Sequence, residues 1–319
     1  MKLLWASDVH YELSKCMSEA FHALNVQMAI PSGDYQVTHY PETRRWFGGT
    51  QWTPEYAKKH LKYNNALILN KEQILDWKPD CIIITCYESS FEVLYELAPK
   101  LPKTTKVAFF SGNNYPENIY PWYQIRNYLA ADLPSFNLCK KHNVANFLYY
   151  RPWLDYDKFK FNPTSQMAVG SYICDFERNF PDCYQFSRQL EAKIPEIKHN
   201  FHTKSTRDEV HQSMNDSIAT LHIKIDGYGY SVIQSMAVGR PVFVHPELAK
   251  QCSYQNWCIE GETAFYVSSP SEYRAKLKAL IDSVDYRNWV HWNCAQKVRE
   301  YINNENETEK LGKFLENLQ

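Results

Sequence analysis

Several signals that would place a chain in a broad class are missing from these 319 residues. The nine cysteines are odd in number and scattered, and no C-x-x-C pair occurs, so neither a disulfide framework nor a zinc site is indicated. The chain has no signal peptide and no apolar run of membrane-spanning length, so we expect a soluble, cytoplasmic protein. With 35 Lys and Arg against 36 Asp and Glu, no global field attracts nucleic acid or an anionic membrane.

Apolar runs of strand length alternate with helical stretches along both halves of the chain, which predicts parallel, doubly wound α/β sheets. The length suggests two domains. In the first half we expect strands at 2–7, 27–31, 81–85, 106–110, 136–139 and 146–150, with helices at 14–24, in the region that ends at 74, and at 90–97 and 123–131. In the second half we expect strands at 167–173, 197–202, 217–225, 242–244 and 264–267, with helices at 184–192, 206–214, 231–239 and 271–283 and two more at the end.

The most informative stretch runs from 217 to 246, SIATLHIKIDGYGYSVIQSMAVGRPVFVHP. A β-rich run is broken by Asp226-Gly227-Tyr228-Gly229, and a helix follows with Ser231 as its expected N-cap. Gly239 and Pro241 then end that helix. A glycine turn that opens a helix points backbone N–H groups outward at the positive end of the helix dipole, which predicts an anion site suited to a diphosphate.

The longer pattern DGYGYSVIQSMAVGRPV resembles the EGFGLxxLEAMAxGxPV signature of retaining sugar-nucleotide glycosyltransferases with the GT-B fold. In that family two glutamates, separated by seven residues, hold the sugar hydroxyls and the ribose of the donor. Asp226 and Gln234 stand at these positions here, and both keep hydrogen-bonding capacity. The segments RPWLDYDKF at 151–159 and EGET at 260–263 resemble two further family patterns, PNGVDxxxF and ENGxTGxLV.

The resemblance implies two Rossmann-like domains that face each other across a cleft. On this basis residues 1–155 form an acceptor domain and residues 156–303 a donor domain, and the helix within 304–319 packs back on the first domain. The implied activity is transfer of a hexose or pentose, with retention and without a metal, from a nucleoside-diphosphate sugar to a hydroxyl group. UDP or GDP is the expected nucleotide, and no cofactor is expected beyond this co-substrate.

The resemblance also implies a donor site on the second domain. Asp226 is expected to position the sugar and Gln234 the ribose, while Gly227, Gly229, Tyr230 and Ser231 offer groups to the phosphates. Tyr228 either packs on the sugar or fills the turn. The family adds an Arg and a Lys from the loop after the first strand of this domain; the corresponding loop begins at Gly170 and has only one cation, Arg178. His202 lies where the family binds the base, although a lone His at a strand end is more often structural.

Acceptor groups are expected on loops of the first domain, where Asp8, His10, Asn113 and Asn114 follow predicted strands. The acceptor class stays open between a glycan, a lipid-linked sugar, a small metabolite and a modified base in viral DNA, the last without support from the charge. Arg44 and Arg45 in the long loop at 33–54 could meet an anionic acceptor.

Two other functions compete with this reading. Ala6-Ser7-Asp8-Val9-His10 resembles the SDxH opening of metal-dependent phosphoesterases, but the further His and carboxylate ligands of that family are missing. The replacements at Asp226 and Gln234 and the single cation of the loop also fit a catalytically weak GT-B protein that binds a nucleotide or assists a partner enzyme.

Overall fold

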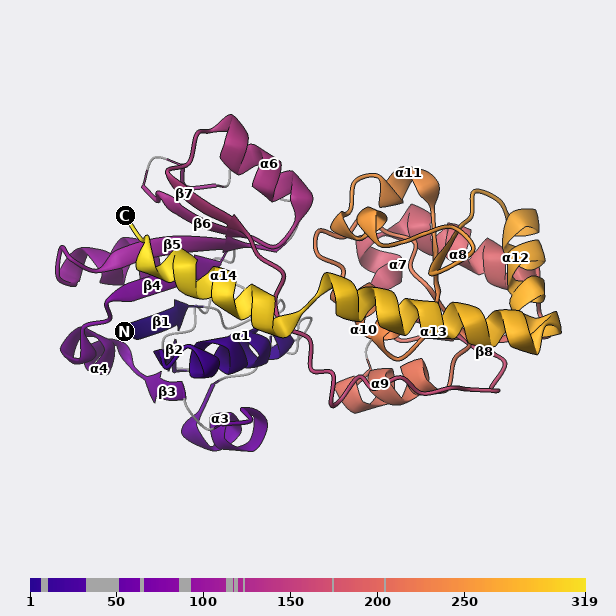
Figure 1. Ribbon diagram of the computed structural model, residues 1–319, viewed down its shortest axis with the longest axis horizontal. Coiled ribbons are helices and arrows are strands. Elements are labelled where there is room, and N and C mark those ends of the chain that lie inside the picture. Colours follow the sequence, from indigo (N-terminus) through magenta and orange to yellow (C-terminus); the bar gives the residue numbers. More distant parts are fainter. Residues whose placement is uncertain are drawn as a thin grey trace. The chain divides into compact units, whose positions relative to one another are not determined.

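The computed structural model describes residues 1–6, 11–32, 52–63, 66–85, 93–112, 117, 120–122, 124–173, 175–203 and 205–319. The chain divides into two compact units, and each has its own sheet. Unit 1 comprises Met1–Trp153 and Asn303–Gln319, and unit 2 comprises Leu154–Ile302. Unit 1 is therefore built from both ends of the chain, and the whole of unit 2 lies between its two parts in the sequence (Figure 1).

Within the described residues, the sheet of unit 1 has seven strands, and every adjacent pair is parallel. The central strands are buried on both faces, as expected for a parallel sheet covered by helices. Neighbours along the sheet are, in order, β3 (Ala66–Leu69), β2 (Gln27–Pro31), β1 (Lys2–Ala6), β4 (Cys81–Thr85), β5 (Lys106–Ser111), β6 (Asn127–Ala130) and β7 (Asn146–Tyr149).

Helices cover this sheet, and the last helix of the chain is one of them. α14 (Asn304–Glu316) packs against β7 and α1 (Figure 1). The C-terminal residue continues the attachment, since the Gln319 N–H donates to Asn127 Oδ1 at 2.9 Å. The other helical segments of unit 1 are α1 (Tyr11–Ala23), α3 (Pro54–His60), α4 (Lys71–Trp77), a π-helical turn (Val93–Leu97), a 3₁₀ turn (Ala98–Lys100) and α6 (Leu133–Lys141).

Three expectations for this half are wrong. Residues 66–69 form β3 inside the region expected to be helical. Residues 127–130 form β6 instead of a helix, and 136–139 belong to α6 instead of a strand. All four residues of β6 are buried, so no alternation distinguishes it from a helix. Asp132 caps α6 by accepting from the Ser135 N–H at 2.8 Å, and Pro134 follows in the first turn, which is the start signal that the sequence does contain.

The sheet of unit 2 is also parallel, with five strands among the described residues. The chain enters at β8, adds β9 on one side, and then adds β10, β11 and β12 on the other. The order therefore reverses between β8 and β10, which makes their carboxyl ends the switch point where ligands bind in open α/β sheets. Neighbours along the sheet are β12 (Ala264–Tyr266), β11 (Val242–Val244), β10 (Ala219–Leu221), β8 (Ala168–Ser171) and β9 (Lys198–Phe201).

The helix that follows β10 is the most buried helix of unit 2. α10 (Tyr230–Ala237) lies beside α13 (Val284–Tyr301), and every residue from Val232 to Ala237 is buried. Arg240 fixes its far end: the fully buried guanidinium donates to the carbonyls of Met214, Asn162 and Asn215, so this arginine is structural. The other helical segments of unit 2 are α7 (Phe176–Asn179), α8 (Pro181–Ala192), α9 (Arg207–Asn215), α11 (Pro246–Ala249), a 3₁₀ turn (Ser253–Asn256) and α12 (Pro270–Asp282).

A buried ion pair joins α14 to the rest of unit 1, and its removal tests how unit 1 is closed. Glu307 is 1% exposed in its side chain and accepts from the Arg151 guanidinium at 2.5 Å and from the Arg151 N–H at 3.0 Å. Lys310 adds a contact at 2.8 Å. Because Glu307→Gln leaves the Arg151 charge poorly compensated, we expect it to lower the free energy of unfolding by roughly 2–4 kcal/mol.

Urea denaturation followed by circular dichroism measures this change. Glu309→Gln is the matched control, because Glu309 pairs with Lys313 on the same helix while both side chains are about two-thirds exposed, at 65% and 68%. We expect the control to change stability little. Equal midpoints for the two variants would contradict a closing role for Glu307.

Candidate functional site

The candidate site lies at the switch point of unit 2, where the chain leaves β10. Residues 222–229 connect β10 to α10, and they follow a strand whose neighbour is β8. Phe180, which follows α7 after β8, reaches the same edge: its ring lies 5.4 Å from the Lys224 ammonium. The two connections therefore meet at one end of the sheet.

The glycine turn has a conformation that only glycine adopts easily. Gly229 is the N-cap of α10 with φ +77°, and a Cβ built on it would lie 2.6 Å from Cδ1 of the Tyr254 ring. The expectation that Ser231 caps the helix is wrong, because the left-handed Gly229 starts the helix at Tyr230. In the described part of the chain no acceptor pairs with the N–H groups of Ser231 or Val232. Free donors at a helix start are groups that can bind an anion.

Asp226 holds the turn and a lysine together. Its Oδ1 accepts from the Gly229 N–H at 3.2 Å, and its Oδ2 lies 3.0 Å from the Lys224 ammonium. The Asp226 N–H is itself fixed by Cys252 Sγ at 3.1 Å. The side chains of Asp226 and Lys224 are 14% and 20% exposed, so the ion pair is partly accessible to solvent.

His222 is the third side chain of the cluster that Asp226 and Lys224 form. Its side chain is 0% exposed, its Nε2 lies 3.5 Å from Asp226 Oδ2, and its Nδ1 lies 3.4 Å from Ser231 Oγ. Burial lowers the pKa of His222 more than Asp226 raises it, so the ring is neutral at pH 7. Burial alone would raise the pKa of Asp226, but Lys224 and His222 together hold it well below its usual range. At neutral pH the charges of Asp226 and Lys224 therefore cancel.

The remaining residues predicted on this turn and helix differ in how accessible their side chains are and whether these are hydrogen-bonded. Tyr228 is 3% exposed and packs edge-on against Tyr230, so its ring has almost no free surface. Ser231 lies at the second position of α10, next to the free N–H groups. Gln234 lies one turn further along and is 9% exposed, and no described residue hydrogen-bonds its side-chain amide. The structure thus brings Gly227, Gly229, Tyr230, Ser231 and Gln234 to the start of one helix.

The residues predicted on the β8 and β9 side have clear local packing. A Cβ at Gly170 would lie 1.9 Å from Tyr172 Oη, so this glycine makes room for a tyrosine that stacks on His202. His202 Nδ1 lies 2.8 Å from Ser205 Oγ, and its Nε2 has no partner among the described residues. Burial lowers the pKa of His202. Arg178 is exposed on α7, two residues before Phe180, and so belongs to the segment that reaches Lys224.

The predicted acceptor residues Asp8, His10, Asn113 and Asn114, and also Arg44 and Arg45, lie outside the described residues. Within the described ranges, no three His, Cys, Asp or Glu side chains are close enough together to hold a metal ion. The helices of the described part include none that combines the length and apolar character needed to cross a membrane.

Lys224 and His222 belong to the cluster around Asp226 and were not predicted from the sequence. Both precede Asp226 in the run His222-Ile223-Lys224-Ile225, which the sequence pattern assigns to the end of the strand expected at 217–225. β10 ends at Leu221, so these side chains lie on the loop at the carboxyl end. The available signal was the polar residue at every second position before the turn, because a strand buried on both faces has no place for a lysine.

No family model matches the chain, and no curated protein matches it in sequence. Solved structures do match its fold. HepE of Anabaena, in complex with UDP-glucose, aligns with a TM-score of 0.67 over 100% of both chains at 9% identity. A glycosyltransferase from Rickettsia africae aligns with a TM-score of 0.65 over 99% of both chains at 11% identity.

A variant of TarM from S. aureus, in complex with UDP and alpha-GlcNAc-glycerol, aligns with a TM-score of 0.61 at 12% identity. This match covers 76% of the present chain and 57% of TarM, so the chain spans little more than half the length of that protein. The expected fold class is confirmed: the chain has two parallel α/β sheets, one in each unit, and its fold matches GT-B glycosyltransferases such as HepE.

Gly229→Ala tests whether the turn needs glycine for its packing. The substitution adds left-handed strain of about 1–2 kcal/mol. It also adds an overlap with Tyr254 that costs roughly 1–3 kcal/mol more. Gly261→Ala is the control, because Gly261 has φ +76° but its nearest atom, Tyr286 Oη, would be 3.7 Å from a new Cβ.

Thermal unfolding of both variants separates the two costs. We expect Gly229→Ala to lower Tm clearly more than Gly261→Ala. Equal decreases in Tm would show that the Tyr254 ring can shift away from the new methyl group without loss of stability.

Proposed function

We propose that this protein is a glycosyltransferase that moves a sugar from a UDP-sugar to a hydroxyl acceptor. The observation that carries the proposal is the start of α10, where free backbone N–H groups follow a glycine turn at the switch point of a GT-B-like unit. UDP is favoured because HepE and TarM are described with UDP or UDP-glucose. The diphosphate binds at the N–H groups of Ser231 and Val232, where the helix dipole favours negative charge.

The donor sugar and ribose lie on either side of this diphosphate. Asp226, which follows β10, is proposed to accept from the sugar hydroxyls, since a carboxylate with two partners still has lone pairs available. Gln234 is proposed to bind the ribose with its uncommitted amide. His202 and Gly170, after β9 and in β8, border the place for the base, and Arg178 adds positive charge from α7.

In the transfer itself, the bond between the anomeric carbon and the diphosphate oxygen breaks, and its electron pair leaves with the diphosphate. The acceptor oxygen bonds to the carbon and its proton passes to a base, a role that the departing phosphate can fill. We propose retention of configuration and no metal requirement, because the positive end of α10 and nearby cations balance the charge that develops on the diphosphate.

Nucleotide binding is the first test. We expect UDP to raise Tm without added magnesium or manganese, because a ligand that binds only the folded state stabilises it by mass action, about 2.7 kcal/mol at a hundred times Kd. GDP is expected to give a smaller shift. A chain that binds no nucleoside diphosphate would overturn the proposed function.

Variants of Asp226 and Gln234, which stand at the two glutamate positions of the resembling motif, test the assigned roles. Asp226→Asn keeps an acceptor for the Gly229 N–H but loses the charge, so we expect donor turnover to fall about 100-fold without weaker UDP binding. Gln234→Ala should weaken UDP binding about 3- to 20-fold, the loss expected for one or two hydrogen bonds. Gln212→Ala on the exposed face of α9 is the matched control.

A second candidate is a nucleotide-binding protein without transferase activity. Both carboxylate oxygens of Asp226 already have partners in the free protein, which favours a structural role for this residue. The same variants distinguish the two candidates. If wild-type protein binds UDP tightly but neither transfers nor hydrolyses a UDP-sugar over a broad acceptor panel, the binding function is the correct one.

A further inference from the structure

We propose that Lys224 is the cation that binds the donor diphosphate, and that Asp226 holds this lysine in place and offsets its charge while the site is empty. The inference rests on the proposed function and adds a residue to it. The connection from β8 to α8 contains one cationic residue, Arg178. Lys224 supplies a second cation from the opposite connection, after β10.

The position of Lys224 fits this role. It lies two residues before Asp226 on the loop that leads into the glycine turn, and its ammonium lies 3.0 Å from Asp226 Oδ2. Its backbone carbonyl accepts from Tyr254 Oη at 3.3 Å, and Tyr254 is the same ring that packs on Gly229. The backbone of Lys224 and the N-cap of α10 therefore both contact Tyr254. The Phe180 ring, on the connection after β8, lies 5.4 Å from the ammonium and stabilises its positive charge by a cation–π interaction.

The charges around the ammonium show why the ion pair matters. Asp226 is ionised and His222, buried beneath it, is neutral, so Lys224 and Asp226 sum to zero. Lys224 is 20% exposed, so a diphosphate can reach it while the ion pair stays formed. In this arrangement Asp226 orients the ammonium but also repels the diphosphate. The carboxylate therefore lowers affinity for the anion.

A second observation points to a ligand here. His222 Nε2 is fully buried, and its contact with Asp226 Oδ2, at 3.5 Å, is too long for a good hydrogen bond. Buried polar atoms without a well-formed hydrogen bond are rare in native structures. A small shift of Asp226 Oδ2 toward His222, with the Lys224 ion pair kept, would shorten this contact to a hydrogen bond when a diphosphate binds the ammonium.

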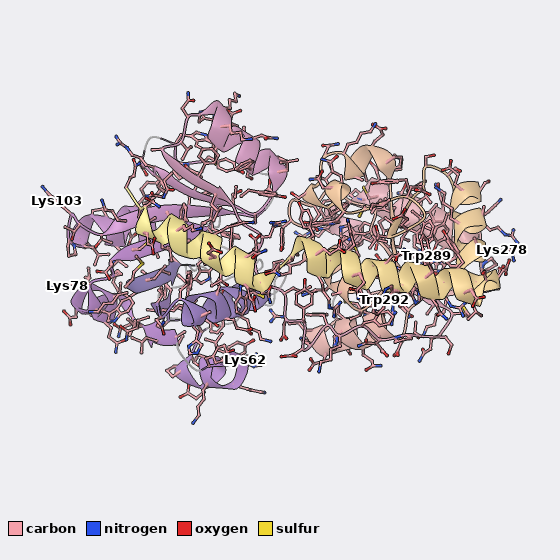
Figure 2. The ribbon with its side chains drawn as sticks, in the orientation of Figure 1. Lys62, Lys78, Lys103, Lys278, Trp289 and Trp292 are labelled. Carbon is pink, nitrogen blue, oxygen red and sulfur yellow. The ribbon has the colours of Figure 1, made fainter. Side chains whose placement is uncertain are left out.

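The experiment measures affinity for UDP and for inorganic pyrophosphate by isothermal titration calorimetry. The proteins compared are wild type, Lys224→Met, Lys224→Arg, Asp226→Asn and the double variant Lys224→Met/Asp226→Asn. Lys278→Met is the control, because Lys278 is an exposed, ion-paired lysine on α12 of the same unit (Figure 2). Tm of each variant is recorded so that a loss of folding is recognised.

We expect Lys224→Met to weaken both ligands about 10- to 100-fold, Lys224→Arg to stay within about threefold of wild type, and Lys278→Met to have no effect. Asp226→Asn is expected to tighten both ligands about 3- to 10-fold when Lys224 is present. In the Lys224→Met background it should recover part of the lost affinity, because the carboxylate left without its lysine repels the diphosphate. This recovery, at an unchanged Tm, is the result that a purely structural role of Lys224 would not produce.

Each alternative outcome decides between the two proposals. If wild type binds UDP but Lys224→Met binds it equally well, the inference is overturned and the proposed function stands. If wild type binds pyrophosphate in a Lys224-dependent way but does not bind UDP, the inference stands and the proposed function fails. Binding of neither ligand by wild type overturns both. If Lys224→Met does not fold, the Asp226→Asn arm decides, since weaker or unchanged binding there contradicts the offsetting of charge.

Discussion

The carboxylate of Asp226 is the point on which the candidate site depends. One oxygen accepts from the Gly229 N–H and so fixes the left-handed turn that starts α10; the other holds the Lys224 ammonium. Burial keeps His222 neutral, so among the described residues the cation paired with the carboxylate is Lys224. A single ionised group thereby sets a backbone conformation, a side-chain position and the local charge. Its replacement by a neutral residue of the same shape separates these effects, because the geometry persists while the charge is lost.

The sequence was sufficient for the fold class because the strongest signals coincide in unit 2. The β-rich run, the two glycines and the helix follow one another in the order of a strand–turn–helix unit. Together they form a motif that is long enough to compare with a known family. In unit 1 the residues of β6 and α6 were assigned to the opposite classes. Both segments are short, and β6 is buried on both faces, so hydrophobic periodicity carries no information there. Tertiary pairing, which places β6 between β5 and β7, decides its conformation.

Within the site, the sequence predicted the residues that lie on the glycine turn and did not predict their partners. Lys224 and His222 were hidden because the expected strand continued to Ile225, whereas β10 ends at Leu221. Strand ends are set by where neighbouring strands stop pairing, and β11 pairs with Thr220 and Leu221 only. The observed helix start differs from the predicted one for a related reason. Gly229 has a left-handed conformation and lies so close to the Tyr254 ring that no larger residue fits there, and this conformation makes it the N-cap. Such contacts join residues that are distant in sequence, and no local pattern encodes them.

The division of unit 1 between the two ends of the chain has a consequence for synthesis on the ribosome. Translation proceeds through Trp153, then through all of Leu154–Ile302, and only afterwards produces α14. Until then β7 lacks the helix that covers it, and the Glu307 carboxylate that accepts from Arg151 does not yet exist. Unit 2 is contiguous and can complete its sheet while unit 1 still waits for its last helix. A nascent chain of about three hundred residues would therefore carry one finished unit and one with an uncovered sheet face, the state in which a growing polypeptide is most exposed to chaperones and to aggregation.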